Sequence, residues 1–210
     1  MMFVIHICLQ RPKDLRMSTI DFYFDYRSPY SFLALSQVRK MDVEIVFRPL
    51  ELGDLMVRVG NVPTSLTCEA KGRYVMADLG RWTAHYGVGL NRHPQASEID
   101  ASRLLRATLV AGQLGAMSKA VETIFHAFWS VPAPLTTVTE IATLLSAAGF
   151  DAGELERRMD SPATQALLEQ ATAEAASRGV FGVPTLFVGD EMFFGNDRLH
   201  FVRDHLERAL

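Results

Sequence analysis

A serine placed directly before a helix is the residue of this chain best suited to chemistry. Ser28 precedes Pro29 and a helical stretch from Tyr30 to Lys40, so Ser28 is expected to cap that helix and Pro29 to occupy its first position. Unpaired backbone N–H groups and the positive end of the helix stabilise an anion there. A hydroxyl can donate a charge-assisted hydrogen bond to the same anion. Ser28 is therefore predicted to stabilise an anion; the simpler interpretation is a helix cap.

A second chemically informative feature is the pair Val183-Pro184 near the end of the chain. A residue before proline is biased to an extended backbone. The apolar run Thr185 to Val188 is then expected to be a strand with Pro184 at its start, where the missing N–H is tolerated. Gly189-Asp190 predicts a tight turn, and Glu191 to Phe194 predicts a second strand that pairs back on the first.

The elements that must position these residues follow the order of a thioredoxin-like fold. Ile20 to Tyr26 alternates apolar and polar residues as a strand does, and Val43 to Leu50 predicts a second strand. After a long insert and the hairpin, Gly195-Asn196-Asp197 begins a closing helix that runs from Arg198 towards Leu210. Strand, helix, strand, insert, hairpin and helix is the thioredoxin-like order.

The insert between Glu51 and Arg178 carries helical periodicity and hardly a strand signal. Gly149 predicts the end of one helix, and Asp151 with Glu154 predicts a capping box at the start of the next. Ser161-Pro162 predicts the start of a long helix that ends at Gly179. The insert is therefore predicted to be helical throughout, with further helices over Ala70 to Tyr86, Ala101 to Leu109, Leu114 to Trp129 and Thr137 to Ala148.

Four segments of the chain resemble one known family. They are DFYFDYRSPYSFLA at 21–34, GNVP at 60–63, AKGRYVMADLGRW at 70–82 and VFGVPTLFVGDEMFFGNDRL at 180–199. They are similar to the 2-hydroxychromene-2-carboxylate isomerases and their relatives, the kappa-class glutathione transferases, within the DsbA-like superfamily. The resemblance implies an α/β, thioredoxin-like fold with a large all-helical insertion. Its expected divisions are a flexible N-terminal extension (1–17), a thioredoxin-like domain (18–52 and 179–210) and an inserted helical domain (53–178).

The resemblance also gives the serine before the helix a role. Ser28 stands where redox members of the superfamily place the first cysteine of a CxxC motif, and Ser31 stands at the second position. Two serines cannot cycle between dithiol and disulfide, so redox catalysis at this site is excluded. Ser28 is instead expected to be the catalytic residue that stabilises the thiolate of bound glutathione.

The same resemblance assigns the remaining glutathione contacts. It implies a cis Val183-Pro184 bond, whereas base rates for X-Pro bonds favour trans, and it implies that the backbone of Val183 pairs with the tripeptide. The turn at Asn196 and Asp197 is expected to hold the γ-glutamyl carboxylate and ammonium, or else simply to cap the last helix. Asn61 and Lys71 are expected to contact the tripeptide as well, although both residue types are common in turns and helices without such a role.

Composition restricts the partners and the compartment. The chain has 210 residues, and 21 Lys and Arg against 24 Asp and Glu give a net charge of −3 without basic runs, so nucleic acid is not an expected partner. Cys8 and Cys68 form no CxxC pair and the histidines lack the spacing of metal ligands, so no metal site is expected. Because two distant cysteines do not make a disulfide framework, a reducing cytoplasm is favoured. Residues 1–16 lack a signal-peptide pattern, no membrane association is predicted, and Met17 is an alternative start.

The prediction for function is a glutathione-dependent isomerase that acts on an aromatic-degradation intermediate such as 2-hydroxychromene-2-carboxylate. The alternatives are a kappa-like glutathione transferase that conjugates electrophiles and a non-catalytic protein that binds glutathione or thiol peptides. Relatives imply a homodimer. Arg27, Met56 and the loop at 93–100 depart from the family pattern on the acceptor side, so the acceptor is expected to differ from the family's own.

Overall fold

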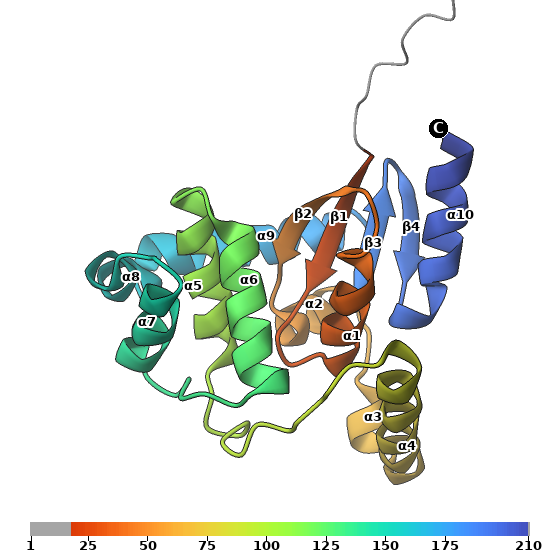
Figure 1. Cartoon of the computed structure of the whole chain (residues 1–210), viewed down its shortest axis with the longest axis horizontal. Helices are drawn as coiled ribbons and strands as arrows, with labels where there is room; N and C mark the ends of the chain where they lie inside the picture. The colour runs from red at the N-terminus through yellow and green to blue at the C-terminus, as the bar shows by residue number, and fades with distance from the viewer. Residues whose placement is uncertain (1–17, 210) are drawn as a thin grey trace, which may run out of the picture.

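The computed structural model of the chain describes residues 18–209, and the predicted N-terminal extension and Cys8 lie outside this range. Four strands and ten α-helices follow one another in the described residues (Figure 1). The elements are β1 (Thr19–Phe24), α1 (Pro29–Val38), β2 (Glu44–Pro49), α2 (Leu52–Arg58), α3 (Thr64–Thr67), α4 (Glu69–Tyr86), α5 (Ala101–Gln113), α6 (Met117–Phe125), α7 (Val138–Ala147), α8 (Ala152–Met159), α9 (Pro162–Ser177), β3 (Thr185–Val188), β4 (Glu191–Phe194) and α10 (Leu199–Ala209).

The strands form one mixed sheet in the order β2-β1-β3-β4. β1 and β2 are parallel, with Phe22 opposite Phe47, whereas β3 is antiparallel to β1, with Leu186 opposite Phe22. The hairpin of β3 and β4 aligns Thr185 with Phe194. Every strand predicted from the sequence is present, and residues 51–178 contain none, so the thioredoxin-like fold with a helical insertion is confirmed.

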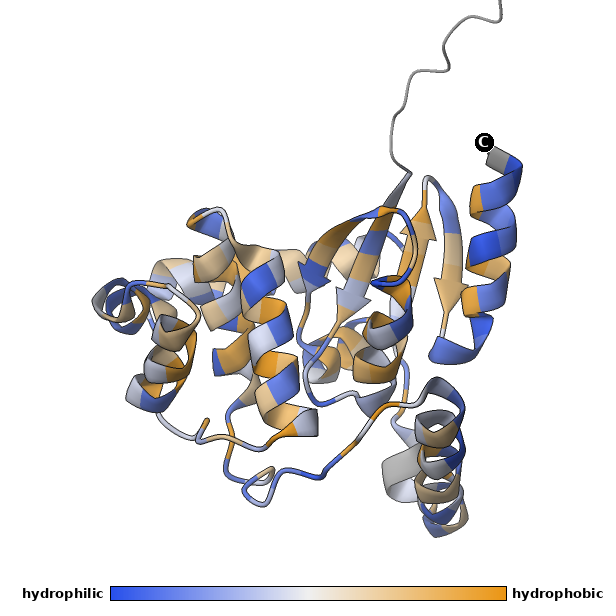
Figure 2. Cartoon of the chain, viewed as in Figure 1, coloured by the Kyte–Doolittle hydropathy of each residue, from blue (hydrophilic) through white to orange (hydrophobic). Residues whose placement is uncertain are grey.

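The two faces of the sheet follow from alternation along β1. Ile20, Phe22 and Phe24 are fully buried in a core that also contains side chains of α1 and α10. Tyr23 points the other way, into a smaller cluster that contains Ala175 of α9. Helices therefore cover both faces, and in Figure 2 β3 is mostly hydrophobic while hydrophilic and hydrophobic residues alternate along α10.

The larger core continues from the sheet into the inserted helices. The ring of Phe125 on α6 lies 5.4 Å from the ring of Phe24 and 4.7 Å from the ring of Tyr26, centroid to centroid. Burial of these aromatic rings ties α6 to the strand that carries the turn before α1. The boundaries of a separate inserted domain stay a prediction.

Some of the helix starts and ends predicted from the sequence are confirmed, and others lie elsewhere. Ser161 caps α9, with Pro162 in its first position. Asp151 caps α8 by accepting from the Glu154 N–H, but the reciprocal capping box is formed at Thr137 and Glu140. The predicted helix 114–129 begins later, at Met117, and α6 then continues without a break into a π-helical turn over His126–Ser130. The short helices α2 and α3 lack a sufficient apolar period to be predicted individually.

Between residues 18 and 209, none of the helices combines the length and the hydropathy needed to cross a membrane.

Candidate active site

Ser28 lies where the sequence places it, at the N-cap of α1. Its side chain is 6% exposed, and its Oγ accepts a 3.1 Å hydrogen bond from the N–H of Ser31. The same hydroxyl donates across to the carbonyl of Val183, over a long 3.4 Å. Because the helix N–H occupies a lone pair of the hydroxyl, its hydrogen stays available to a stronger acceptor such as a thiolate.

The Val183-Pro184 peptide bond is cis, as the resemblance implies and against the base rate for X-Pro bonds. Val183 is 8% exposed, and within residues 18–209 its backbone N–H has no hydrogen-bond partner. The N–H of Gly195 donates to the carbonyl of Pro184 at 2.9 Å. The turn before α1 therefore meets the segment before β3 and the turn after β4, although Ser28 and Val183 are 155 residues apart in sequence.

The residues after β4, Asn196–Arg198, form a short 3₁₀ helix. Helix α10 begins only after it, at Leu199. Asn196 is 4% exposed, and its side-chain Nδ2 has no partner among the described residues. Its carbonyl accepts from the hydroxyl of Tyr86 at 2.8 Å. Asp197 is half-buried and forms an ion pair with Arg198. A buried amide donor without a partner is costly in a folded protein, which fits a ligand acceptor at this turn.

Asn61 and Lys71 do not contact Ser28 by hydrogen bonds. Their side chains bond Phe181 and Thr64 instead. Asn61 donates from Nδ2 to the carbonyl of Phe181 at 2.8 Å, two residues before Val183. Lys71 is exposed and donates to the hydroxyl of Thr64 at 2.9 Å. The structure therefore brings Ser28, Val183 and the Asn196 turn together and leaves Lys71 on the neighbouring helix α4.

Helix α4 is joined to the candidate site by hydroxyl groups. Tyr30, in the first turn of α1, donates to the Asp78 carboxylate at 2.9 Å, and Tyr86 at the end of α4 reaches Asn196. Partial burial and the neighbouring Asp78 raise the pKa of Tyr30. Tyr30 is therefore a donor that links α1 to α4, and it stays protonated at neutral pH.

Trp129 and Asp25 support the turn before α1. The indole Nε1 of Trp129 donates to the carbonyl of Tyr26 at 2.8 Å. Asp25 is 2% exposed. Burial raises the pKa of Asp25, against hydrogen bonds from the N–H groups of Arg27 and Leu52.

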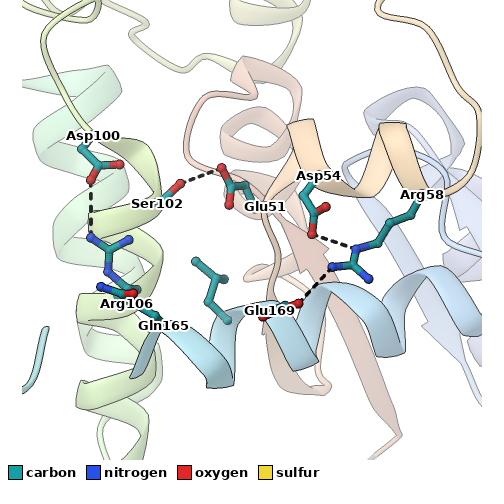
Figure 3. A pocket seen from close by; sticks show the side chains of 9 residues that line it. Glu51, Asp54, Arg58, Asp100, Ser102, Arg106, Gln165 and Glu169 are labelled. Atoms are coloured by element: carbon teal, nitrogen blue, oxygen red, sulfur yellow. Dashed lines mark hydrogen bonds and ion pairs between the residues drawn. The ribbon is translucent and has the colours of Figure 1, made fainter. Parts of the chain in front are cut away.

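A hollow of about 500 Å³ between α2, α5 and α9 is a separate feature of the molecule. Figure 3 shows that its side chains are largely charged and paired with one another, Arg58 with Asp54 and Arg106 with Asp100. An aromatic ligand needs an apolar wall with few polar groups. We therefore leave this hollow out of the candidate site.

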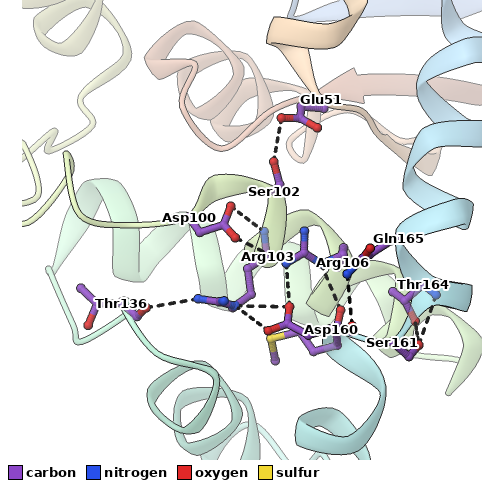
Figure 4. Close-up of polar contacts among 11 residues, drawn as sticks. Glu51, Asp100, Ser102, Arg103, Arg106, Thr136, Asp160, Ser161, Thr164 and Gln165 are labelled. Atoms are coloured by element: carbon purple, nitrogen blue, oxygen red, sulfur yellow. Dashed lines mark hydrogen bonds and ion pairs between the residues drawn. The ribbon is translucent and has the colours of Figure 1, made fainter.

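A network of ion pairs next to that hollow joins α5 to Asp160, the residue that follows α8. Figure 4 shows Arg103 and Arg106 converging on Asp160, with N–O distances of 3.1 and 2.6 Å. Burial opposes ionisation of Asp160, but the hydrogen bonds and charges of the two arginines outweigh it and lower the pKa of Asp160. This arrangement is structural.

Known proteins show the same combination of fold and sequence. A family model described as a DSBA-like thioredoxin domain matches residues 19–207. The chain is 34% identical over 193 residues to a 2-hydroxychromene-2-carboxylate isomerase of Sphingobium xenophagum, covering 90% of this chain and 97% of that protein. It is 26% identical to glutathione S-transferase kappa 1 of Caenorhabditis elegans, covering 92% of each.

A solved structure of 2-hydroxychromene-2-carboxylate isomerase has the same overall arrangement. Its TM-score is 0.82 at 29% sequence identity, covering 91% of this chain and 95% of that chain. With the family model and the sequence relatives in agreement, the chain belongs to the 2-hydroxychromene-2-carboxylate isomerase family, within the DSBA-like thioredoxin domain proteins.

Proposed function

We propose that this protein is a glutathione-dependent isomerase of an aromatic-degradation intermediate, with 2-hydroxychromene-2-carboxylate as the first substrate to test. The observation that carries the proposal is the Ser28 hydroxyl at the N-terminus of α1, 3.4 Å from the carbonyl of Val183 beside a cis proline. A thiol peptide extended along Val183 would place its sulfur near this hydroxyl.

The residues fit glutathione at three points. Ser28 has a hydroxyl hydrogen that can leave its long bond to the Val183 carbonyl for a stronger acceptor. Among residues 18–209, neither the backbone N–H of Val183 nor the buried Nδ2 of Asn196 has a hydrogen-bond partner, so both can bind an extended peptide. The carboxylate of Asp197, next to Asn196, can bind the ammonium of the γ-glutamyl group. To do so, it would give up its ion pair with Arg198. Lys71, exposed on α4, supplies a positive charge for the glycyl carboxylate.

Bound glutathione would supply the thiolate nucleophile that adds reversibly to an unsaturated carbon, so that a bond can rotate before elimination. Ser28 stabilises negative charge on sulfur by hydrogen bonding, with the N-terminal N–H groups of α1 behind it. Val183 fixes the peptide backbone and so orients the reacting atom. Ser31 is fully buried and has no thiol, so this pair of positions carries no disulfide chemistry.

The direct test follows the ultraviolet spectrum of 2-hydroxychromene-2-carboxylate with and without glutathione. We expect conversion to the trans-o-hydroxybenzylidenepyruvate isomer only when glutathione is present. Conversion at equal, measurable rates in both samples would refute the cofactor proposal. If the spectrum does not change in either sample, related unsaturated aromatic acids serve as the next acceptors, because Arg27, exposed beside Ser28, and Met56, half-buried on α2, depart from the family pattern on the acceptor side.

A second candidate function is glutathione transfer, supported by the likeness to the kappa transferases. It uses the same thiolate site but leaves the adduct as the product. Mass spectrometry of the product separates the two, because only conjugation adds the mass of glutathione. Tight glutathione binding without turnover of any electrophile would instead support the third candidate, a non-catalytic thiol-peptide binding protein.

We also propose a homodimer in a reducing cytoplasm. Exposed apolar side chains near the cis proline support the dimer: Phe181 and Phe194 are 36% and 40% exposed with ring centroids 4.6 Å apart, and Val62 is 58% exposed. Such a patch on a protein surface commonly marks a protein interface. Cys68 is exposed and forms no disulfide within residues 18–209, which suits a compartment that keeps thiols reduced. Sedimentation velocity of the wild type and of Phe194→Glu tests the dimer, and a monomeric wild type would refute it.

A further inference from the structure

Asp25 is a buried carboxylate that joins two turns of the backbone. Its Oδ1 accepts from the N–H of Arg27 at 2.8 Å, and its Oδ2 accepts from the N–H of Leu52 at 2.9 Å. The carbonyl of Asp25 also accepts from the N–H of Ser28 at 3.0 Å. One residue therefore shapes the turn that ends at Ser28 and ties this turn to the first residue of α2.

The start of α2 is itself held firmly by the rest of the molecule. Glu51, the residue before α2, makes no side-chain cap for it. Instead, the Glu51 N–H donates to the hydroxyl of Thr172 on α9 at 3.0 Å, and the Glu51 carboxylate accepts from Ser102 on α5 at 2.8 Å, as Figures 3 and 4 show for the second bond. Asp25 thus takes the place of a missing cap and fastens the Ser28 turn to a fixed point.

The far end of α2 reaches the other side of the candidate site. The N–H of Asn61 donates to the carbonyl of Met56 at 2.9 Å, so Asn61 is tied to the end of α2. Its side chain then bonds the carbonyl of Phe181, two residues before Val183. Helix α2 is therefore attached at one end to the segment that contains Ser28 and at the other end to the segment that contains Val183.

We propose that Asp25 is a positioning residue, which through α2 sets the Ser28 hydroxyl against the backbone of Val183. This inference rests on the proposed function, since it gives that reaction a residue responsible for aligning Ser28. Asp25 is 2% exposed, and both of its carboxylate oxygens already accept backbone N–H groups. Its action is geometric: when the bond to Leu52 is lost, Ser28 and the N-terminus of α1 can shift relative to the cis-proline segment.

The sharpest test removes the hydrogen bond between the Leu52 N–H and Asp25, with a control for the loss of the leucine side chain. Leu52 occupies the first position of α2, where proline is tolerated, and Glu51 has the extended backbone that must precede proline (φ −86°, ψ 109°). Leu52→Pro therefore deletes the N–H that bonds Asp25. Leu52→Ala is the matched control, because it loses the side chain but keeps the N–H. We expect turnover of Leu52→Pro to fall about fivefold to a hundredfold below that of Leu52→Ala, with glutathione affinity changed less than about threefold.

A second readout does not depend on isomerase activity. In a Ser28→Cys background, the rate of alkylation by iodoacetamide against pH gives the pKa of the introduced thiol, which the α1 N-terminus is expected to lower below about 8.5. Adding Leu52→Pro should raise that pKa, whereas adding Leu52→Ala should not. Equal turnover and equal thiol pKa in the Pro and Ala variants would overturn the proposal. A raised thiol pKa in a protein without glutathione-dependent activity would refute the proposed function and uphold the role of Asp25.

Asp25→Asn gives an independent check should Leu52→Pro fold poorly. It keeps the size of the side chain but replaces one acceptor oxygen by a donor, so one of the two N–H bonds is lost. Asp21→Asn is its control, because Asp21 lies on β1, four residues before Asp25, and bonds Arg48 and Arg178 instead. We expect turnover to fall in Asp25→Asn beyond any change seen in Asp21→Asn at matched melting temperature; an equal change in both would also overturn the proposal.

Discussion

The indole of Trp129 and the backbone of Tyr26 are joined by a 2.8 Å hydrogen bond across 103 residues of sequence. Tyr26 precedes Ser28 by two residues, and its hydroxyl bonds Thr108 of α5 at 2.6 Å. The helical insert therefore holds the turn before α1 at two points, one through a π-helical turn and one through α5. π-Helical turns occur frequently at functional sites, which agrees with this placement.

Trp129→Phe should therefore reduce both stability and turnover. The substitution leaves the Tyr26 carbonyl without its donor, and loss of a partner by a buried polar group costs about 1–3 kcal/mol. Melting temperature and turnover at saturating substrate measure the two effects. A lower melting temperature with unchanged turnover would limit Trp129 to stabilising the fold.

Ser28→Ala is expected to lower turnover well before it lowers glutathione affinity. The hydroxyl acts on the sulfur, whereas the peptide contacts at Val183 and Asn196 remain. Losing a hydrogen bond to a charged group costs about 1.5–3 kcal/mol, or roughly tenfold to a hundredfold in rate. Calorimetric titration with glutathione and steady-state kinetics check the two halves of this expectation. Turnover equal to that of the wild type would leave Ser28 with its capping role alone.

Asp197→Ala should weaken glutathione binding and spare turnover at saturation, because the ammonium lies remote from the reacting sulfur. The lost contact binds glutathione equally well in the ground state and in the transition state. Its removal therefore raises the apparent dissociation constant for glutathione and leaves turnover at saturation unchanged. Among residues 18–209, the Asp197 carboxylate bonds only the exposed Arg198, so melting temperature should change little. A variant that melts earlier but binds glutathione normally would remove Asp197 from the site.

Acid stability provides a test of the network around Asp160. The folded-state pKa of Asp160 is lowered, so the stabilisation is present above its ordinary value of 3.8 and is lost as pH falls through the lower folded value. Between about pH 5 and pH 3 the melting temperature of Asp160→Asn should therefore fall less steeply than that of the wild type. Asp190→Asn, in the exposed turn between β3 and β4, controls for the loss of one charge. Parallel curves for wild type and Asp160→Asn would contradict the assignment.

The sequence by itself determined the elements whose signals are local. Ser28-Pro29 marks a helix start because a hydroxyl acceptor and a preset φ act within one turn. Alternation along Ile20 to Phe24 marks a strand because side chains point to opposite faces with a period of two. These rules, with the motif resemblance, were sufficient for the thioredoxin-like order and for the family.

Only the tertiary structure decided which groups are buried and which distant segments meet. Asp25 follows β1 in the sequence much as an exposed residue would, and only the tertiary structure places the Leu52 N–H at the start of α2 against its carboxylate and buries it. The bonds from Asn61 to Phe181 and from Trp129 to Tyr26 span more than 100 residues, and no local pattern encodes such pairs. Long-range contacts form where helices and strands bury their apolar faces against one another. That packing, and not the neighbouring residues in the chain, determines which polar groups meet.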